Sequence, residues 1–178
     1  MMSGVLGRRR LRRFARLDPS AMGVRLGGFV YGTIVVLSVL VAGVRAYPHD
    51  AGRIVGLVVG TSLVFWVAHV YAHGISRSIA DADRLSLADL REIAHHEASI
   101  LEAAVPPVVA LLFGFIGVVS TQTAVWIAFA LGLVLLFVEG LVVARVERFG
   151  ALGTVAIVAA NVALGLALVG LKLVLNHH

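Results

Sequence analysis

A series of long apolar runs, separated by short polar segments, most constrains the fold of this chain. The first run, Leu26 to Val44, forms a helix of about 28 Å at 1.5 Å per residue, which matches the hydrocarbon core of a bilayer. Four further runs cover 54–71, 106–119, 124–144 and 152–174. Only 14% of the residues are charged, against roughly 25% in soluble domains. The sequence predicts an all-α fold, a polytopic integral membrane helical bundle of about five transmembrane helices in one domain over 26–175.

Basic residues cluster ahead of the first run. The tail, residues 1–25, holds seven arginines, at positions 8, 9, 10, 12, 13, 16 and 25. Beside a hydrophobic helix, such a cluster favours cytoplasmic retention and attraction to anionic headgroups, worth about 1 kcal/mol per charge near the surface. With five spans, 12 basic residues share the side of the tail, and Arg45, Arg53 and Lys172 face the other side. We therefore expect a plasma membrane protein with its N-terminus cytoplasmic and its C-terminus outside.

A cleaved secretory signal is an alternative reading of the same N-terminal region. The basic start, the apolar run and Val44-Arg45-Ala46 have the order of such a signal. The run is longer than the roughly 7 to 15 residues of a signal core, and further apolar runs follow it. A membrane anchor is therefore favoured over cleavage.

The longest polar stretch after the tail lies between the second and third runs. Residues 76–85 form a connector, and Ser86 followed by Asp89 has the pattern of a capping box. Apolar residues then recur at helical period. The pattern predicts an amphipathic helix over 87–104, lying on the cytoplasmic surface.

Two features of this segment concern its far end and its apolar face. Pro106 lacks the N–H that a helix interior uses, so a break near Val105 is predicted. Glu97 falls on the apolar stripe, where an unpaired carboxylate is expensive to bury. Glu97 is therefore a local inconsistency in the pattern that needs an explanation.

Small residues four apart predict close helix packing inside the membrane, because they let two backbones approach. Three such pairs occur: Gly28 with Gly32, Gly56 with Gly60, and Ala128 with Gly132. Expected partners of the chain are the lipid bilayer, anionic headgroups at the tail and a second copy of the chain; nucleic acid is not expected.

Ionisable and polar residues inside the spans are the first candidate site. His69 and Glu139 come out at the same depth when counted from the outer starts of their spans, and Asn161 lies near mid-membrane. Intramembrane ionisable groups usually face a partner or a water-filled cavity. We predict that His69 pairs with Glu139, either along an ion pathway or as a contact that only fixes helix packing.

A second candidate site would hold a divalent metal ion at the cytoplasmic face. Without cysteine, any ligands must be His, Asp or Glu. Glu92-Ile93-Ala94-His95 has the Glu-x-x-His spacing of di-iron bundles, although those need two such motifs. The solvated face of a surface helix is the ordinary explanation. The candidate ligands are His73, Glu92, His95, His96 and Glu102.

The stretch Phe65-Trp66-Val67-Ala68-His69-Val70-Tyr71-Ala72, with Tyr31-Gly32-Thr33 and Thr123-Ala124-Val125-Trp126, resembles a group of small multi-pass membrane proteins of actinobacteria. That resemblance implies a membrane bundle and no particular activity. Trp66 and His69 also resemble a pair in the bacterial relatives of the endolysosomal potassium channel. This chain has Phe29-Val30-Tyr31 where that family has Phe-Ser-Asp.

Three functions fit the sequence. One is a small channel or transporter for protons or a cation, lined by His69, Glu139 and Asn161. The second is a metal-dependent membrane enzyme, which the absence of a nucleotide-binding loop or hydrolase motif disfavours. The third is a structural or partner-binding membrane protein. His177 and His178 end the chain and are given no role.

Overall fold

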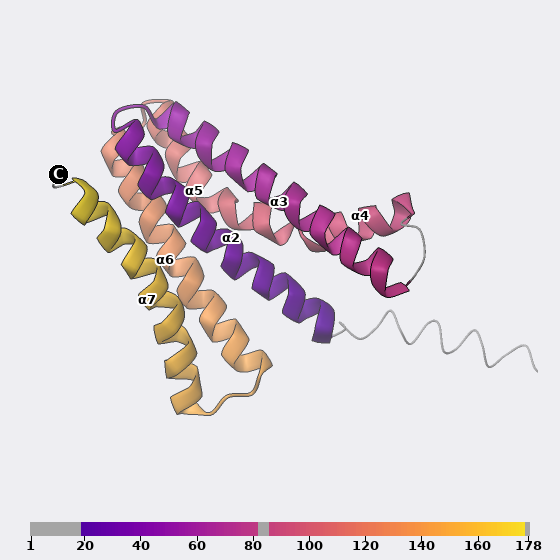
Figure 1. Cartoon of the computed structure of the whole chain (residues 1–178). Coiled ribbons are helices and arrows are strands. Elements are labelled where there is room, and N and C mark those ends of the chain that lie inside the picture. The colour runs from indigo at the N-terminus through magenta and orange to yellow at the C-terminus, as the bar shows by residue number, and fades with distance from the viewer. Residues whose placement is uncertain (1–18, 82–85, 177–178) are drawn as a thin grey trace, which may run out of the picture.

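A computed structural model describes residues 19–81 and 86–176 and shows, over those ranges, a bundle of α-helices without strands (Figure 1). The helices are α2 (Pro19–Ala46), α3 (Ala51–Asp81), α4 (Leu87–His96), α5 (Ser99–Phe115), α6 (Thr121–Val146) and α7 (Ala151–Asn176). The predicted all-α bundle is confirmed. Most of the arginine-rich tail, and His177 with His178, lie outside the described residues.

Four of the described helices are each long and apolar enough to cross a membrane. These segments are Arg25–Ala46, Ala51–Ile79, Thr121–Val146 and Ala151–Leu171. Helix α5 is shorter, about 25 Å at 1.5 Å per residue, and forms with α4 a pair bent by 44°. With this pair counted as one span, the protein has five spans, so it is a membrane protein of four or five spans.

Successive long helices run in opposite directions (Figure 1). We call the side that holds α4, the start of α2 and the ends of α3 and α6 the α4 side, and the opposite side the far side. Helix α2 contacts α3, α5, α6 and α7 and so occupies the middle of the bundle. Toward the α4 side, the α6–α7 pair diverges from α2 and α3 (Figure 1).

The core lies where these helices converge, toward the far side. Large side chains from four helices are fully buried there: Leu37 and Leu40 of α2, Ile54 and Val58 of α3, Leu111 of α5, and Phe129 and Leu136 of α6. Dispersion contacts between such close-packed side chains, and not exclusion from water, stabilise helix contacts in lipid.

Two of the three predicted small-residue seams are confirmed. A Cβ on Gly32 would lie 2.8 Å from the carbonyl oxygen of Ile100, so α2 rests directly on the backbone of α5. At Gly132, a Cβ would lie 2.6 Å from Leu37. The prediction for Gly56 and Gly60 is wrong, because nothing lies within 4 Å of a Cβ at either position. That part of α3 faces outward instead.

The segment over 87–104 differs from the prediction of one helix that breaks near Val105. Helix α4 ends at His96, and α5 begins at Ser99 and continues through Pro106 and Pro107. These prolines remove two helical N–H donors. Interior prolines are tolerated in membrane helices because surrounding groups satisfy the freed carbonyls. The break therefore falls at a different place, next to Glu97.

The start of α4 is confirmed as a capping box. Ser86 Oγ accepts the N–H of Asp89 at 3.1 Å, and the Asp89 carboxylate accepts the N–H of Ser86 at 3.1 Å. The Ser86 hydroxyl also donates to Asp89 at 2.6 Å. These bonds, the hydroxyl first, hold the pKa of Asp89 below its usual value.

The contact between α2 and α5 predicts opposite outcomes for two glycines. Gly32→Ala forces the α2 and α5 backbones apart and is expected to lower the free energy of unfolding by about 1–3 kcal/mol. Gly56→Ala meets nothing and improves helix propensity, so it should leave this energy unchanged or raise it by up to about 1 kcal/mol. Unfolding of both variants in mixed detergent micelles measures the difference. Equal stability of the two variants would contradict the close contact.

Candidate functional site: a buried carboxyl beside two cavities

The central feature of the site is the carboxyl of Glu139 on α6, which is buried between helices with 5% of the residue exposed. Its Oε1 accepts a hydrogen bond of 2.8 Å from the hydroxyl of Thr33 on α2. Glu139 lies about 10 Å from the end of α6 at Val146, at 1.5 Å per residue. The carboxyl is therefore well inside the membrane-spanning bundle.

The second oxygen of this carboxyl, Oε2, is buried and has no hydrogen-bond partner among the described residues. Thr33 itself is fully buried, and its Oγ1 also lies 3.0 Å from the carbonyl oxygen of Phe29 in its own helix, a second acceptor for the same single proton. A buried carboxylate with an unsatisfied oxygen is costly. A proton or a cation on Oε2 would remove that cost, which makes Glu139 a candidate binding group.

Asn161 of α7 lies beside Glu139 on the next helix. Its Nδ2 donates to the carbonyl of Leu136, one turn before Glu139, at 3.4 Å. Gly140 makes this approach possible, because a Cβ there would lie 3.3 Å from Asn161 Nδ2 and 3.0 Å from Val158 Cα. Asn161 and Glu139, both candidates for the ion pathway, therefore lie in the same part of the bundle, and Asn161 bonds to the backbone of α6 and not to the Glu139 carboxyl.

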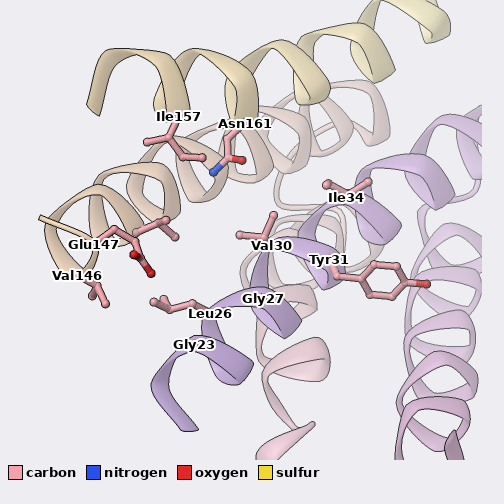
Figure 2. A pocket seen from close by; sticks show the side chains of 11 residues that line it. Gly23, Leu26, Gly27, Val30, Tyr31, Ile34, Val146, Glu147, Ile157 and Asn161 are labelled. Carbon is pink, nitrogen blue, oxygen red and sulfur yellow. The ribbon is translucent and has the colours of Figure 1, made fainter. Parts of the chain in front are cut away.

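A cavity of about 720 Å³ leads from the α4 side toward this region (Figure 2). It runs between α2 and the α6–α7 pair, where these elements diverge. The lining residues are Gly23, Leu26, Gly27, Val30, Tyr31 and Ile34 of α2, Val143, Val146 and Glu147 at the end of α6, and Ile157 and Asn161 of α7. Thr33 directly precedes Ile34, and Glu139 is one turn from Val143, so the carboxyl lies just beyond the deep end.

A second cavity, of about 650 Å³, lies along the same two helices on the far side. Its lining residues are Ser38, Val41, Ala42, Arg45 and Ala46 of α2, and Leu168 and Leu171 of α7. Along α2, the first cavity ends at Ile34 and the second begins at Ser38, about 6 Å further on. The two cavities are therefore almost end to end.

The barrier between the cavities is Leu37, which is completely buried. Its side chain fills the space over Gly132, where a Cβ would lie 2.6 Å from Leu37 Cδ2. Over Gly165, Leu133 and Leu136 lie closest to a Cβ, at 2.6 and 2.7 Å, and Leu37 Cδ1 lies 3.6 Å away. Leu37 is one helical turn from Thr33, the partner of Glu139. The buried carboxyl and the apolar barrier are thus neighbours on α2.

The predicted pair of His69 with Glu139 is wrong. Glu139 bonds to Thr33, whereas His69 Nδ1 lies 2.9 Å from the carbonyl of Phe65 in its own helix. The His69 ring packs against Tyr31, with the ring centroids 4.9 Å apart. His69 and Glu139 lie at a similar depth but on helices that barely touch, α3 and α6. Helix α2 lies between these two helices and contacts both.

The structure explains the place of Glu97 on the apolar stripe, because Glu97 is paired with His73. Glu97 Oε1 lies 2.7 Å from His73 Nδ1 of α3, with 4% of the Glu97 side chain exposed. Trp66 lies two turns before His73 on α3, and its Nε1 donates at 3.0 Å to the carbonyl of Ala94, three residues before Glu97. Both contacts fall at the α4–α5 bend, so α3 holds the bend in place.

The predicted metal cluster is wrong for the residues that the structure describes. No group of three or more His, Asp or Glu side chains there is arranged to hold a metal ion. The predicted ligands were His73, Glu92, His95, His96 and Glu102. Glu92 instead pairs with Arg77 at 3.1 Å, and Glu102 pairs with Arg25 at 3.1 Å. The bend between α4 and α5 directs these carboxylates toward arginines on different helices.

Comparison of the chain with protein-family models, curated proteins and solved structures found no match. The resemblance to small actinobacterial membrane proteins through Phe65–Ala72 stays a prediction. Sequence reasoning missed Thr33, whose only signal is a hydroxyl in an otherwise apolar run.

The hydrogen bond from Thr33 predicts a stability difference between two hydroxyl variants of α2. Thr33→Val leaves Glu139 without a donor and is expected to lower the free energy of unfolding by about 1–3 kcal/mol. Ser38→Ala is the control, because Ser38 bonds only to Ile34 of its own helix, at 2.8 Å, and should cost at most about 0.5 kcal/mol. Unfolding in mixed micelles measures both, and an unchanged Thr33→Val variant would contradict the bond.

Proposed function

We propose that this protein is a small transporter that moves protons or a cation across the membrane, with the carboxyl of Glu139 as its binding group. The observation that carries the proposal is the place of this carboxyl. It lies one turn of α6 from Val143, which lines the first cavity, and it bonds to Thr33, which is one turn of α2 from Leu37. The second cavity begins at Ser38, on the opposite side.

The chemistry of the carboxyl supports this function. An ionisable group inside a span is costly to bury, and such groups typically mark ion or proton paths. The free Oε2 offers a site for a proton or a cation, and Thr33 holds the other oxygen. A residue that serves helix packing alone gains nothing from a free oxygen, because an amide or a methyl group would pack there at lower cost.

The packing of Leu37 supports a mechanism in which an ion reaches Glu139 from one side of the membrane and then from the other. The barrier side chain, Leu37, rests on Gly132 of α6, while Gly165 of α7 lies under Leu133 and Leu136 of α6. A small shift of the α6–α7 pair against α2 would move Leu37 off Gly132. That shift would open Glu139 to the far-side cavity, as packed helices slide in a shear motion.

The proposed orientation places the α4 side in the cytoplasm of the cell and the C-terminus outside. Basic residues of the described chain concentrate on the α4 side: Arg25, Arg77, Arg91, Arg145 and Arg148, against Arg45 and Arg53 on the far side. Short loops that carry more Lys and Arg stay cytoplasmic. The tail then meets the anionic headgroups of the inner leaflet of the plasma membrane.

Glu139→Gln predicts loss of transport without loss of the fold. The amide keeps the size of the carboxyl and still accepts from Thr33, but it neither binds a proton nor carries charge at neutral pH. Proteoliposomes loaded with a pH-sensitive dye, with a potassium gradient and valinomycin as the driving force, measure proton flux. We expect the flux of the variant to fall at least about tenfold, the size of effect that loss of an essential proton-transfer group produces.

The matched control is Glu92→Gln, which neutralises an exposed carboxylate paired with Arg77, away from both cavities. This variant should transport at the parent rate. Repeating the assay with sodium or potassium indicators covers a cation other than the proton. Background flux of every ion through the parent, or equal flux through the parent and Glu139→Gln, would rule the proposed function out.

We predict that Leu37→Ala lets ions leak across the membrane, because removing the barrier joins the two cavities. We expect ion flux that no longer depends on Glu139 and so persists in a double variant with Glu139→Gln. The substitution should also cost about 2–5 kcal/mol of stability, as large-to-small core changes do. Leu40→Ala is the control: Leu40 is equally buried on α2 but lies beyond Ser38, where the second cavity begins, and so outside the interval between the two cavities. A leak of the same size in Leu40→Ala would show that destabilisation is its cause.

A further inference from the structure

We infer that the cavity on the α4 side, lined by α2, α6 and α7, is a binding site for a lipophilic cation, a molecule with an apolar body and one positive charge. This inference deepens the proposed function and rests on it in one respect, since it treats the cavity as the entry path to Glu139. It is argued from the walls of the cavity, its charges and its position.

The walls fit an apolar body of drug size. The cavity, of about 720 Å³, lies within the range of about 300–1,000 Å³ typical of small-molecule sites. It follows α2 from Gly23 to Ile34, about 16 Å at 1.5 Å per residue. Most of the side chains that line it are aliphatic: Leu26, Val30, Ile34, Val143, Val146 and Ile157. A metal ion or an inorganic anion would find few polar ligands on these walls.

The charge along the cavity is of one sign. Among the described residues that line it, Glu147 is the charged one, and Figure 2 shows its carboxylate directed toward α2 at the mouth. Glu147 is the C-cap of α6, where the helix dipole adds negative potential. Arg145 and Arg148 flank it in sequence but do not line the cavity. A cation is therefore attracted at the entrance.

The deep end is polar and carries no positive charge among the described lining residues. Asn161 presents a neutral amide there, and the carboxyl of Glu139, with its free Oε2, is one turn of α6 from the lining residue Val143. Tyr31 adds no polar group to the cavity, because its ring points away toward α3, where it packs on Phe65 and His69 (Figure 2). Apolar walls between two acidic groups match a cation whose charge is surrounded by apolar groups.

A phospholipid is the competing occupant, because acyl chains surround the bundle. Its chain suits the walls, but its phosphate would meet the carboxylate of Glu147 at the mouth. Like charges disfavour this placement. The experiment below therefore treats bound lipid as a separate outcome.

The test uses a pair of ions of the same shape and opposite charge, tetraphenylphosphonium and tetraphenylborate. Their binding to the purified full-length protein in detergent is measured by equilibrium dialysis. Both ions also partition into detergent. Site binding is therefore taken as the difference between the parent and Gly27→Leu, which fills the cavity from a position where nothing lies within 4 Å of a Cβ. The matched control is Gly56→Leu, an equally open glycine on α3 outside the cavity.

We expect the phosphonium ion to bind the parent and the Gly56→Leu control equally, and Gly27→Leu at least about tenfold more weakly, a difference of about 1.4 kcal/mol. The borate ion should show no difference between these proteins. Glu147→Gln should weaken phosphonium binding about two- to fivefold, as expected for a partly exposed charge pair.

Three results would overturn the inference. In one, the phosphonium ion binds the parent and Gly27→Leu alike. In another, the borate ion binds the cavity as well as the phosphonium ion does. In the third, mass spectrometry finds a co-purified phospholipid in the parent and in Gly56→Leu that is lost in Gly27→Leu, while no phosphonium binds. Each result leaves the flux test of Glu139→Gln unaffected, so failure of this inference is distinguishable from failure of the proposed function.

Discussion

The close approach of α2 to its neighbours is the constraint on which the rest of the structure depends. In lipid, helices gain little from burying apolar surface against each other, so contact must come from dispersion at short range. Gly32 supplies it on one side, by letting α2 rest on the backbone of α5 at Ile100. On the other side, Leu37 fits over Gly132 of α6. Helix α2 is thereby held between α5 and the α6–α7 pair.

This packing also explains the position of the candidate site. Thr33 lies between Gly32 and Leu37 along α2, so the contacts that fix this helix also bring its hydroxyl to Glu139. The same contacts close the bundle at Leu37 and allow it to diverge toward the α4 side, where the larger cavity forms. The Leu37 barrier, the buried carboxyl of Glu139 and the larger cavity therefore all result from the placement of α2.

The α4–α5 bend is stabilised in a different way, by hydrogen bonds that satisfy its buried polar groups. Four donors serve the last four carbonyls of α4: the N–H groups of Glu97 and Ala98, Trp66 Nε1 and Ser99 Oγ. Glu97 itself is paired with His73. A helix end that keeps its carbonyls satisfied can lie inside a membrane protein. These bonds allow the chain to bend at Glu97, while α5 continues through Pro106.

The sequence by itself determined the all-α membrane bundle, the approximate places of its long helices and the capping box at Ser86, because apolar run length and local hydrogen bonding do not depend on distant parts of the chain. It also identified Glu139, Asn161 and Glu97 as residues whose burial requires a partner. Tertiary structure alone decided which partners they have. His69 and Glu139 share a depth, but depth along a helix carries no information about rotation around its axis or about the helix that lies between. Thr33, Leu37 and the two cavities arise from that rotation and from glycine contacts between helices distant in sequence.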